Sequence, residues 1–411
     1  MGTKPQNMVV HKMRMGFILV VACMGFLAPV HQAHIPSTTI SDLSFKNMDF
    51  AMNLYRKISS YHDNNIFLSP LSVSTSFAAL LMASGGVTHK ELLQGLNLEQ
   101  LERADQPELI PALFQLLHEN ITRNGSLKLD QGMALFTDQQ FVVEEVFKDQ
   151  IKTFFEAEIK SVDFADKEGS IRFINEYIKN KTEDKVTEMM STLDALTELM
   201  LINTIFFQGS WQKPFNPNNT ENEPFYINSY NIVQVPMMFL ADKFYSMEDV
   251  ALGARVLKLP YREGVSMLIL LPNKGMDIVI DDAITAKKFL SWIKNLQKIK
   301  LDVKLPKFKM EESYSLQTFL PDMGMASIFS NSANLTKLSK DKGLTVSEVL
   351  HKAVIKVDET GTIAAAATTT GITAYSLPTT FFVNRPFFFF IYHEATNCLL
   401  FMGRVIDPTK N

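Results

Sequence analysis

Side chains that could act as nucleophiles, acids or bases occur in this 411-residue chain, but without a spacing that defines a catalytic site. The sequence has no Gly-x-Ser-x-Gly elbow, Walker phosphate-binding loop, Gly-x-Gly-x-x-Gly or Cys-x-x-Cys motif. His118-Glu119 and His393-Glu394 lack the second histidine of a zinc-binding His-Glu-x-x-His pattern. A triad assembled from distant residues stays open, but the sequence predicts that the protein is not an enzyme.

A different chemistry, cleavage by another protein, is suggested by the segment from Glu359 to Ser376. After Glu359 it contains no charge and no proline, and most of its residues are small or β-branched. Such a segment can enter a β-sheet, because proline would remove a ladder hydrogen bond and a buried charge would be costly. Alternation would turn one set of residues to the same face: Thr362, Ala364, Ala366, Thr368, Thr370 and Ile372. The segment is either a flexible linker or a loop that can become a strand.

The sequences around this segment resemble those of the serpins, and the resemblance covers nearly the whole chain beyond its N-terminal leader. The matching C-terminal runs are Phe382-Val383-Asn384-Arg385-Pro386-Phe387 and Leu400-Phe401-Met402-Gly403-Arg404-Val405. Asn65 to Ser72 resembles the serpin "shutter", Thr88 to Glu91 a helix start, and Asn203 to Trp211 a strand of the main sheet with the tryptophan of the "breach". The resemblance implies an α+β serpin fold, with about nine helices around three β-sheets and an exposed reactive-centre loop at about 359–380.

In inhibitory serpins a protease cuts this loop and becomes acylated, and the freed loop then inserts as a new central strand. The resemblance implies a reactive bond between Tyr375 and Ser376. It also implies a hinge formed by Glu359, Gly361, Thr362, Ala364, Ala365, Ala366 and Ala367. Non-inhibitory carriers usually have bulky, charged or proline residues in the hinge, and the run from 362 to 367 has none. Inhibition is therefore favoured over a carrier function.

The target follows less directly from the sequence. The ring of Tyr375 suits a chymotrypsin-like pocket, yet the run from Ile372 to Pro378 resembles that of a serpin active in blood coagulation. That serpin inhibits factor Xa with protein Z as cofactor on phospholipid with calcium, and factor XIa without it. The resemblance implies that Tyr230 and Asp282 contact protein Z and that Asp302 is a protease exosite. Alternatively, Tyr230 packs in the protein and Asp282 caps a helix beginning at Ile284.

The N-terminus resembles a secretory signal peptide. Lys12 and Arg14 precede an apolar run from Gly16 to Leu27, which is too short to span a bilayer at about 20 residues. We expect residues 1–33 to be removed, 34–411 to form one domain, and the protein to be secreted into blood plasma. Glycosylation sequons agree with this route and lie at Asn120, Asn124, Asn180, Asn218 and Asn334.

Net charge and cysteine content limit the classes of partner that the protein could bind. Without the leader the chain has 37 basic and 44 acidic residues, a net charge of −7, which argues against general binding of nucleic acid or anionic membranes. Many serpins bind heparin at the stretch equivalent to Pro107 to Arg123, where only Arg123 is basic here, so heparin binding at that place is doubtful. Cys398 would remain as an unpaired, inert thiol. We expect a monomer without a bound cofactor or metal.

Hydrophobic periodicity predicts helices over Leu43–Ser60 and Ser170–Lys179. Strands are predicted over Leu127–Phe136, Leu199–Phe207, Val303–Phe308 and Val349–Val357. The run of four phenylalanines from Phe387 to Phe390 indicates a strand covered on both faces. Helices dominate the first half and strands the second, which is typical of an α+β domain.

Overall fold

The computed structural model describes residues 37–123, 128–262, 264–275, 278–341, 343–361 and 379–410. Contacts divide the chain into two compact units, residues 1–35 and 36–411, and every described residue belongs to the second. The predicted signal peptide, residues 1–33, lies outside the described residues. No described helix is both long enough and apolar enough to cross a membrane.

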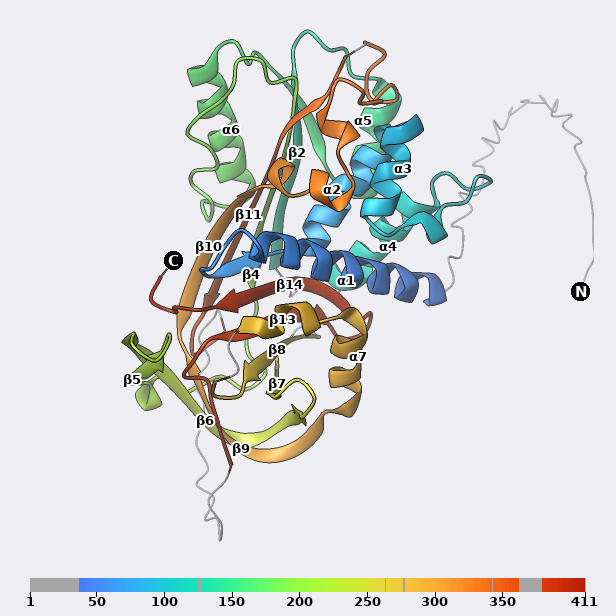
Figure 1. Ribbon diagram of the computed structural model, residues 1–411. Helices are drawn as coiled ribbons and strands as arrows, with labels where there is room; N and C mark the ends of the chain where they lie inside the picture. Colours follow the sequence, from blue (N-terminus) through green and yellow to red (C-terminus); the bar gives the residue numbers. More distant parts are fainter. Residues whose placement is uncertain are drawn as a thin grey trace, which may run out of the picture. The chain divides into compact units, whose positions relative to one another are not determined.

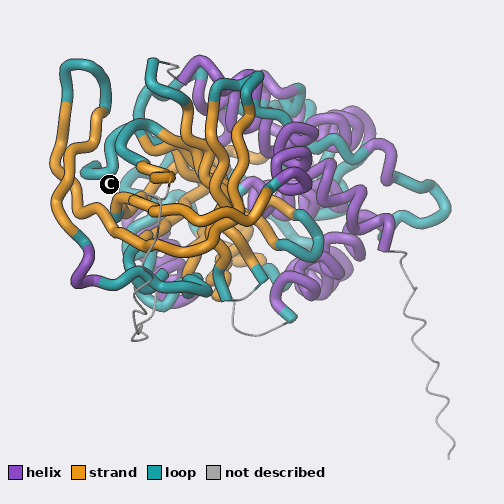
Figure 2. Tube along the Cα trace, turned by 90° about the horizontal axis from the view of Figure 1, so that it is seen from below, coloured by secondary structure: helices purple, strands orange, loops and turns teal. Residues whose placement is uncertain are grey.

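Seven α-helices form in the described part of the chain, most of them on one side of the unit (Figures 1 and 2). They are α1 (Ser37–Ser59), α2 (Pro70–Ala83), α3 (Gly86–Gly95), α4 (Leu109–Thr122), α5 (Glu145–Phe155), α6 (Lys167–Lys181) and α7 (Ala286–Asn295). Helix α2 begins where Ser69 accepts a hydrogen bond from the backbone N–H of Ser72 and Pro70 takes the first position, which needs no N–H.

One sheet has five strands, in the order β10 (Phe308–Ser315), β11 (Val346–Val357), β4 (Leu199–Gln208), β2 (Lys128–Asp138) and β3 (Glu158–Val162). Its two central neighbours, β11 and β4, run parallel. The outer partners of this pair, β10 beside β11 and β2 beside β4, run antiparallel to it. The middle of the sheet is therefore a parallel pair with no strand between.

The second sheet has nine strands. Its path is β1 (Ile66–Leu68), β14 (Cys398–Val405), β13 (Phe387–His393), β8 (Val265–Pro272), β7 (Ala254–Pro260), β6 (Ile232–Asp249), β9 (Gln297–Pro306) and β12 (Thr379–Phe382), with β5 (Glu221–Tyr226) also paired to β6. The 18-residue strand β6 joins two groups of strands into this single sheet. The resemblance implies three sheets, and two of them are joined through β6 into this single nine-stranded sheet.

The predicted α+β serpin fold is confirmed, with some changes in its elements. The described residues contain seven α-helices instead of about nine. The strand predicted over Val303–Phe308 is wrong, because that range contains the end of β9 and the start of β10 with Lys307 between them. Pro306 explains the break, since it has no N–H to continue the ladder. All four phenylalanines from Phe387 to Phe390 are buried in β13.

Candidate functional site

The parallel strands β11 and β4 are in continuous register from Val346 beside Leu199 to Ile355 beside Phe207, with one irregularity between Val346 and Glu348. The 12 residues of β11 span roughly 40 Å at about 3.4 Å per residue. A strand entering between them would break this ladder and replace it with two new ones. The single ladder between β11 and β4 would then be replaced by two ladders, one on each side of the new strand, which contain more backbone hydrogen bonds.

At the end of β11 the chain turns sharply over residues Asp358 to Gly361. The amide of Gly361 donates to the carbonyl of Asp358 at 3.2 Å. The Asp358 carboxylate accepts from the backbone N–H of Thr360 at 3.1 Å and from its hydroxyl at 2.7 Å. These bonds close a tight turn that brings Gly361 back beside Asp358.

Trp211 holds this turn against the end of β4. Its indole N–H donates to the Asp358 carbonyl at 2.9 Å, and its backbone N–H donates to the Thr360 carbonyl at 3.2 Å. The indole is 2% exposed and stacks on the Tyr261 ring, with 4.2 Å between centroids and 12° between planes. The predicted breach tryptophan thus fixes the start of the hinge.

Glu359 is a buried acid with two partners. Its carboxylate accepts from the Thr220 hydroxyl at 2.8 Å and from the Lys307 ammonium at 2.8 Å. Burial opposes ionisation, but the hydrogen bonds from Lys307 and Thr220 outweigh it and hold the pKa of Glu359 below its usual value. The backbone carbonyl of Glu359 also accepts from the N–H of Phe215 at 2.8 Å. The side chain and the backbone of Glu359 are therefore both held in place, the side chain by an ion pair with Lys307 and the backbone by Phe215.

Gly361 has a φ of +85° and lies in close contact with the backbone below it. A Cβ at this position would be 2.4 Å from the amide nitrogen of Trp211 and 2.5 Å from the carbonyl oxygen of Gly209. Only glycine combines this conformation with this approach. Gly361, which the resemblance places in the hinge, therefore permits the turn.

Lower in the sheet, side-chain hydrogen bonds cross the same β11–β4 boundary. His351 and Asn203 are direct neighbours in the ladder, and the His351 Nδ1 lies 2.8 Å from the Asn203 Oδ1. The other ring nitrogen, Nε2, accepts from the backbone N–H of Ser69 at 3.0 Å. Nε2 must therefore be unprotonated, and Nδ1 carries the proton that it donates to Asn203. This is a neutral histidine in one fixed tautomer.

Burial agrees with this assignment, because it lowers the pKa of His351 to about 3, only partly opposed by its bond to Asn203. Asn203 is also tied to helix α2. Its amide donates to the Ser72 carbonyl at 3.1 Å and to the Ser76 hydroxyl at 2.8 Å, while its Oδ1 accepts from the Ser72 hydroxyl at 2.5 Å. We call His351, Asn203, Ser69, Ser72 and Ser76 the shutter cluster, and separating β11 from β4 must break its central bond.

Helix α6 covers one face of these strands. Its Ile174 and Ile178 are fully buried in a cluster with Met200 and Ile202 of β4 and Val354 of β11. A strand inserted between β4 and β11 must pass beneath this helix. The buried face of α6 therefore packs across both strands of the boundary and opposes their separation.

The reactive bond and most of the hinge, namely Tyr375, Ser376, Thr362, Ala364, Ala365, Ala366 and Ala367, lie outside the described residues. The structure brings Glu359 and Gly361 together with Trp211 at one end of the β11–β4 boundary. It also shows a contact that the sequence interpretation missed, the Lys307 partner of Glu359. Lys307 directly follows Pro306 at a strand end, but nothing in the sequence pairs it with Glu359.

The residues assigned to partner contacts lie in the nine-stranded sheet and its connections. Tyr230 is 94% exposed between β5 and β6, so the alternative that it packs internally is wrong. Asp282 is exposed in a 3₁₀ turn over Ile278–Ala283. The helix that follows is capped by Thr285, so the alternative that Asp282 caps it is also wrong. Asp302 is half-buried in β9, between Ala241 and Thr380 of the neighbouring strands.

The glycosylation sequons differ in access. Asn180 and Asn218 are exposed. Asn120 is half-buried in α4, where its amide donates to the Leu116 carbonyl at 2.7 Å, and Asn334 is half-buried beside Gly85. Asn124 lies outside the described residues. Accessibility therefore favours Asn180 and Asn218 as attachment points.

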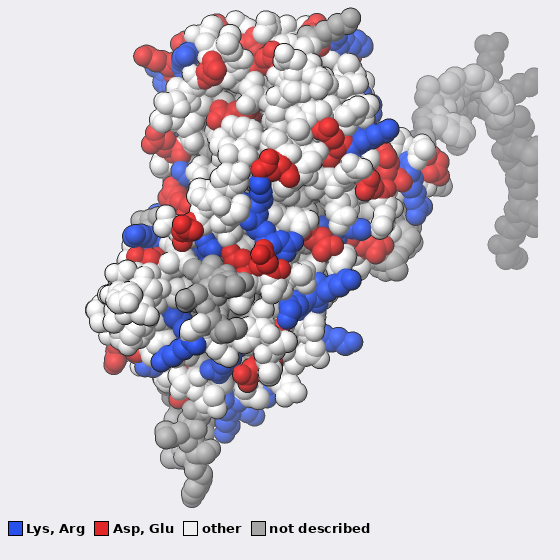
Figure 3. All heavy atoms as spheres, viewed as in Figure 1, with Lys and Arg blue, Asp and Glu red and all other residues white. Residues whose placement is uncertain are grey.

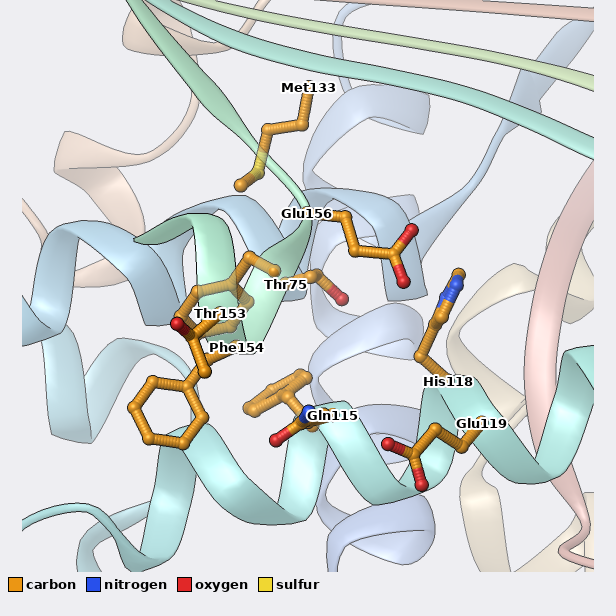
Figure 4. A pocket seen from close by; sticks show the side chains of 10 residues that line it. Thr75, Gln115, His118, Glu119, Met133, Thr153, Phe154 and Glu156 are labelled. Atoms are coloured by element: carbon orange, nitrogen blue, oxygen red, sulfur yellow. The ribbon is translucent and has the colours of Figure 1, made fainter. Parts of the chain in front are cut away.

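A cavity of about 100 Å³ between α4, α5 and β2 contains one of the two His-Glu pairs noted in the sequence. His118 and Glu119 line it from α4, and Glu156 lines it from the end of α5 (Figure 4). Its other lining residues include no serine or cysteine, and they are Thr75, Phe114, Gln115, Met133, Thr153, Phe154 and Phe155. The described residues also contain no group of three or more His, Cys, Asp or Glu that could hold a metal ion. The cavity does not supply the distant triad that the sequence left open.

Comparison with known proteins agrees with this geometry. The family model "Serpin (serine protease inhibitor)" matches residues 45–408, and the chain belongs to this family. The human protein Z-dependent protease inhibitor is 37% identical over 89% of this chain and 83% of its own. Human plasma serine protease inhibitor is 35% identical over 92% and 93%, and rabbit corticosteroid-binding globulin is 37% identical over 88% and 94%.

Two solved structures make the same point in three dimensions. The mouse protein Z-dependent protease inhibitor superimposes with a TM-score of 0.84 at 35% identity, covering 90% of this chain and 98% of that one. Human thyroxine-binding globulin in complex with thyroxine gives 0.85 at 31% identity, covering 90% and 100%. Proteins named as inhibitors and as hormone-binding globulins thus share this fold.

Proposed function

We propose that this protein is a secreted, suicide-substrate inhibitor of serine proteases, cleaved between Tyr375 and Ser376 and trapping the protease by loop insertion between β11 and β4. The observation that carries the proposal is the parallel β11–β4 pair, followed directly by a sharp turn and then by an uncharged, proline-free hinge. The family to which the chain belongs supports the class of target, serine proteases.

Chain direction supports insertion at this place. Strands β11 and β4 run the same way, and the turn at Asp358 to Gly361 reverses the chain. The following residues would therefore run antiparallel to both neighbours, which is the slightly more stable pairing per residue. From Thr362 to Tyr375 the loop would span roughly 48 Å at about 3.4 Å per residue, comparable with the length of the sheet.

The inserted residues would also fit the interior. Thr362 and Ala364 to Ala367 are small, so they would add little volume beneath α6 and against the shutter cluster. A protease acylated on Tyr375 would be carried from one end of the sheet to the other. Distortion of its active site during this movement would stop the acyl bond from being hydrolysed.

The similarity to protein Z-dependent protease inhibitors extends the proposal to particular partners. We propose factor Xa as a target, with protein Z as cofactor on phospholipid with calcium, and factor XIa as a target without it. Tyr230 and Asp282 are both exposed, as contacts with protein Z require, and Asp302 is the proposed exosite. Tethering through a cofactor supplies effective concentration where Tyr375 is a poor fit to a protease that prefers arginine.

The test of insertion is Thr362→Arg, which would force a charge into the sheet. The variant should be cleaved at a normal rate but should form little covalent complex with the protease. Thr379→Arg is the matched control, because Thr379 lies beyond the scissile bond, in β12 of the nine-stranded sheet, and would not insert between β11 and β4. Undiminished complex formation by Thr362→Arg, measured on a denaturing gel, contradicts the insertion mechanism.

The test of the partners uses the purified mature chain and factor Xa, with and without protein Z, calcium and phospholipid. An SDS-stable adduct of summed mass that forms faster with the cofactor supports both assignments. An adduct that forms equally fast without protein Z removes the cofactor from the proposal. Reaction with factor XIa and with a chymotrypsin-like protease, in the same format, separates the remaining targets.

A carrier function is the second candidate, since two of the similar proteins are hormone-binding globulins. The carrier function is favoured if every protease tried cleaves the chain after Tyr375 and none forms a covalent adduct. Binding of cortisol and thyroxine by equilibrium dialysis then decides between a carrier and an inactive inhibitor.

A further inference from the structure

Glu312 lies on the buried face of β10, and no residue that the structure describes pairs with its side chain. Strand alternation places Glu312 on the same face as Met310 and Tyr314, which are both buried. Across the ladder it lies opposite Ala353 of β11, whose side chain has no polar group. Burial raises the pKa of Glu312 to about 7, and no described donor or cation opposes this effect.

The preceding residue of the strand, Glu311, has the partner that Glu312 lacks. Glu311 points to the opposite face of β10, and its carboxylate accepts from the Lys352 ammonium at 2.9 Å. This hydrogen bond holds the pKa of Glu311 below its usual value. A half-buried carboxylate without such a partner is costly, so Glu312 is the unusual member of the pair.

Glu312 lines an open depression between the β5–β6 hairpin and the C-terminal segment, with a volume of about 700 Å³. Apolar side chains form part of its walls, namely Ile227, Ile232, Val233 and Ile406. Asn65 fixes the C-terminal wall, because its amide donates to the Asp407 carbonyl at 2.8 Å and its Oδ1 accepts from the Ile406 N–H at 2.8 Å. The depression is therefore a built feature with apolar walls and a carboxylate.

Two further charged residues line the depression, and neither satisfies Glu312. The Asp407 carboxylate accepts from the backbone N–H of Thr409 at 3.0 Å and from its hydroxyl at 2.6 Å. Lys410 is exposed and forms no ion pair with any acid that the structure describes. The carboxylate of Glu312 thus remains available to a cation from outside the protein.

The rim of the depression is an exposed apolar surface on the β5–β6 hairpin. Tyr230 and Ile232 are both exposed there. Asn228 holds the loop in shape, because its Oδ1 accepts from the backbone N–H groups of Tyr230 and Asn231, both at 2.9 Å. Figure 3 shows an uncharged lobe at the left of the view, where Figure 1 places β5. An exposed tyrosine held beside a depression is typical of a protein–protein interface.

We infer that a protein partner docks on this hairpin by placing an arginine side chain in the depression, with its guanidinium group paired to Glu312. Charge complementarity carries the inference, because the cation would satisfy a carboxylate that the described residues leave without a partner. The apolar walls suit the methylene stem of arginine, and Tyr230 offers a ring at the rim. Arginine is favoured over lysine, because its planar group forms two parallel hydrogen bonds with a carboxylate and is less strongly hydrated.

The site is independent of loop insertion, since β10 is the outer neighbour of β11 and does not border the β11–β4 boundary. The proposed function names protein Z as the partner that contacts Tyr230. Only the identity of the partner rests on that proposal, and the chemistry of the depression does not.

The first test needs no protein partner. N-acetylarginine amide is titrated into the full mature chain at pH 8, where Glu312 is ionised, and binding is measured by saturation-transfer NMR. Glu312→Gln should bind this compound at least about tenfold more weakly than the parent. Glu311→Gln removes the same charge from the opposite face and should bind as the parent does. N-acetylcitrulline amide, which has a similar shape but no charge, should bind the parent weakly.

The second test measures the affinity of protein Z for the same three chains by calorimetry. Glu312→Gln should lower the affinity at least about tenfold, and Glu311→Gln should leave it unchanged. If protein Z does not bind the parent chain at all, the partner named in the proposed function is wrong. The arginine titration then decides alone whether the depression binds a guanidinium group.

Folding measurements separate a binding role of Glu312 from a structural one. Because Glu312 has no partner among the described residues, Glu312→Gln should keep or raise the urea midpoint of unfolding. A lower midpoint would reveal a structural partner and overturn the inference. Equal binding of the arginine and citrulline compounds, or equal losses in Glu312→Gln and Glu311→Gln, would also overturn it. Tighter binding of N-acetyllysine amide would overturn the choice of arginine.

Discussion

Acid should weaken the boundary between β11 and β4 through a single side chain, His351. In the folded protein this histidine is neutral, because Nε2 accepts from the backbone of Ser69 and burial lowers its pKa to about 3. In the unfolded chain its pKa returns to about 6.5. Protonation at Nε2 would replace an acceptor with a donor facing the Ser69 N–H, so the folded state resists it.

The sign and size of the change in stability follow from the difference in the number of protons bound by the unfolded and the folded chain. Between about pH 3 and pH 6.5 the unfolded chain holds a proton on His351 and the folded chain does not, so stability falls as the pH falls. Each pH unit inside this window costs about 1.4 kcal/mol. Between pH 7 and pH 5 the loss attributable to this one histidine is therefore about 2 kcal/mol.

The assay compares the parent with His351→Gln, which keeps a polar side chain but cannot titrate. Urea unfolding of both proteins is followed at pH 7 and pH 5 by tryptophan fluorescence and circular dichroism. His393, whose pKa burial also lowers, is present in both and cancels in the comparison. The parent should lose about 2 kcal/mol more than the variant. Equal losses in the two proteins would refute the argument, because His351 would then titrate alike in both states.

Further substitutions examine the turn and the thiol. Gly361→Ala should lower the urea midpoint of unfolding much more than Gly324→Ala does. Gly324 is the control because its φ of +88° is similar but a Cβ there would meet open space. Equal effects of the two substitutions would mean that the backbone contacts of Gly361 do not matter. Trp211→Phe should cost about 1 kcal/mol in urea unfolding, since the Asp358 carbonyl loses its indole donor, and no change would deny that bond a role. Cys398, buried and with its pKa raised by burial to about 12, should resist iodoacetamide at pH 8 in the native protein and react once unfolded; rapid native labelling in a mass spectrum would contradict its burial.

The parts of the site that could be predicted are those with local signatures. Ser69 followed by Pro70 reads as a helix start, and the structure places it there. Gly361 reads as a turn, and its φ is positive. The parallel strands β4 and β11 are predicted over Leu199–Phe207 and Val349–Val357, because both runs are rich in apolar and β-branched residues.

The parts that could not be predicted depend on contacts between distant segments. His351 is a single polar residue in an apolar strand, and only the fold shows that it meets Asn203, 148 residues earlier in the chain. Strand β6 was not anticipated as one 18-residue element, because its separate pairings with β5, β9 and β7 leave no common period in the sequence.

The parallel pair at the centre of the five-stranded sheet has one more consequence. Under the proposed mechanism, the boundary between β11 and β4 would accept any strand of suitable direction and small side chains, because backbone hydrogen bonds do not depend on which chain supplies the strand. The equivalent segment of a second copy would satisfy the same hydrogen bonds as the protein's own loop. Warm, concentrated protein should therefore polymerise through the five-stranded sheet. The rate should depend on how often the shutter cluster opens and lets β11 separate from β4.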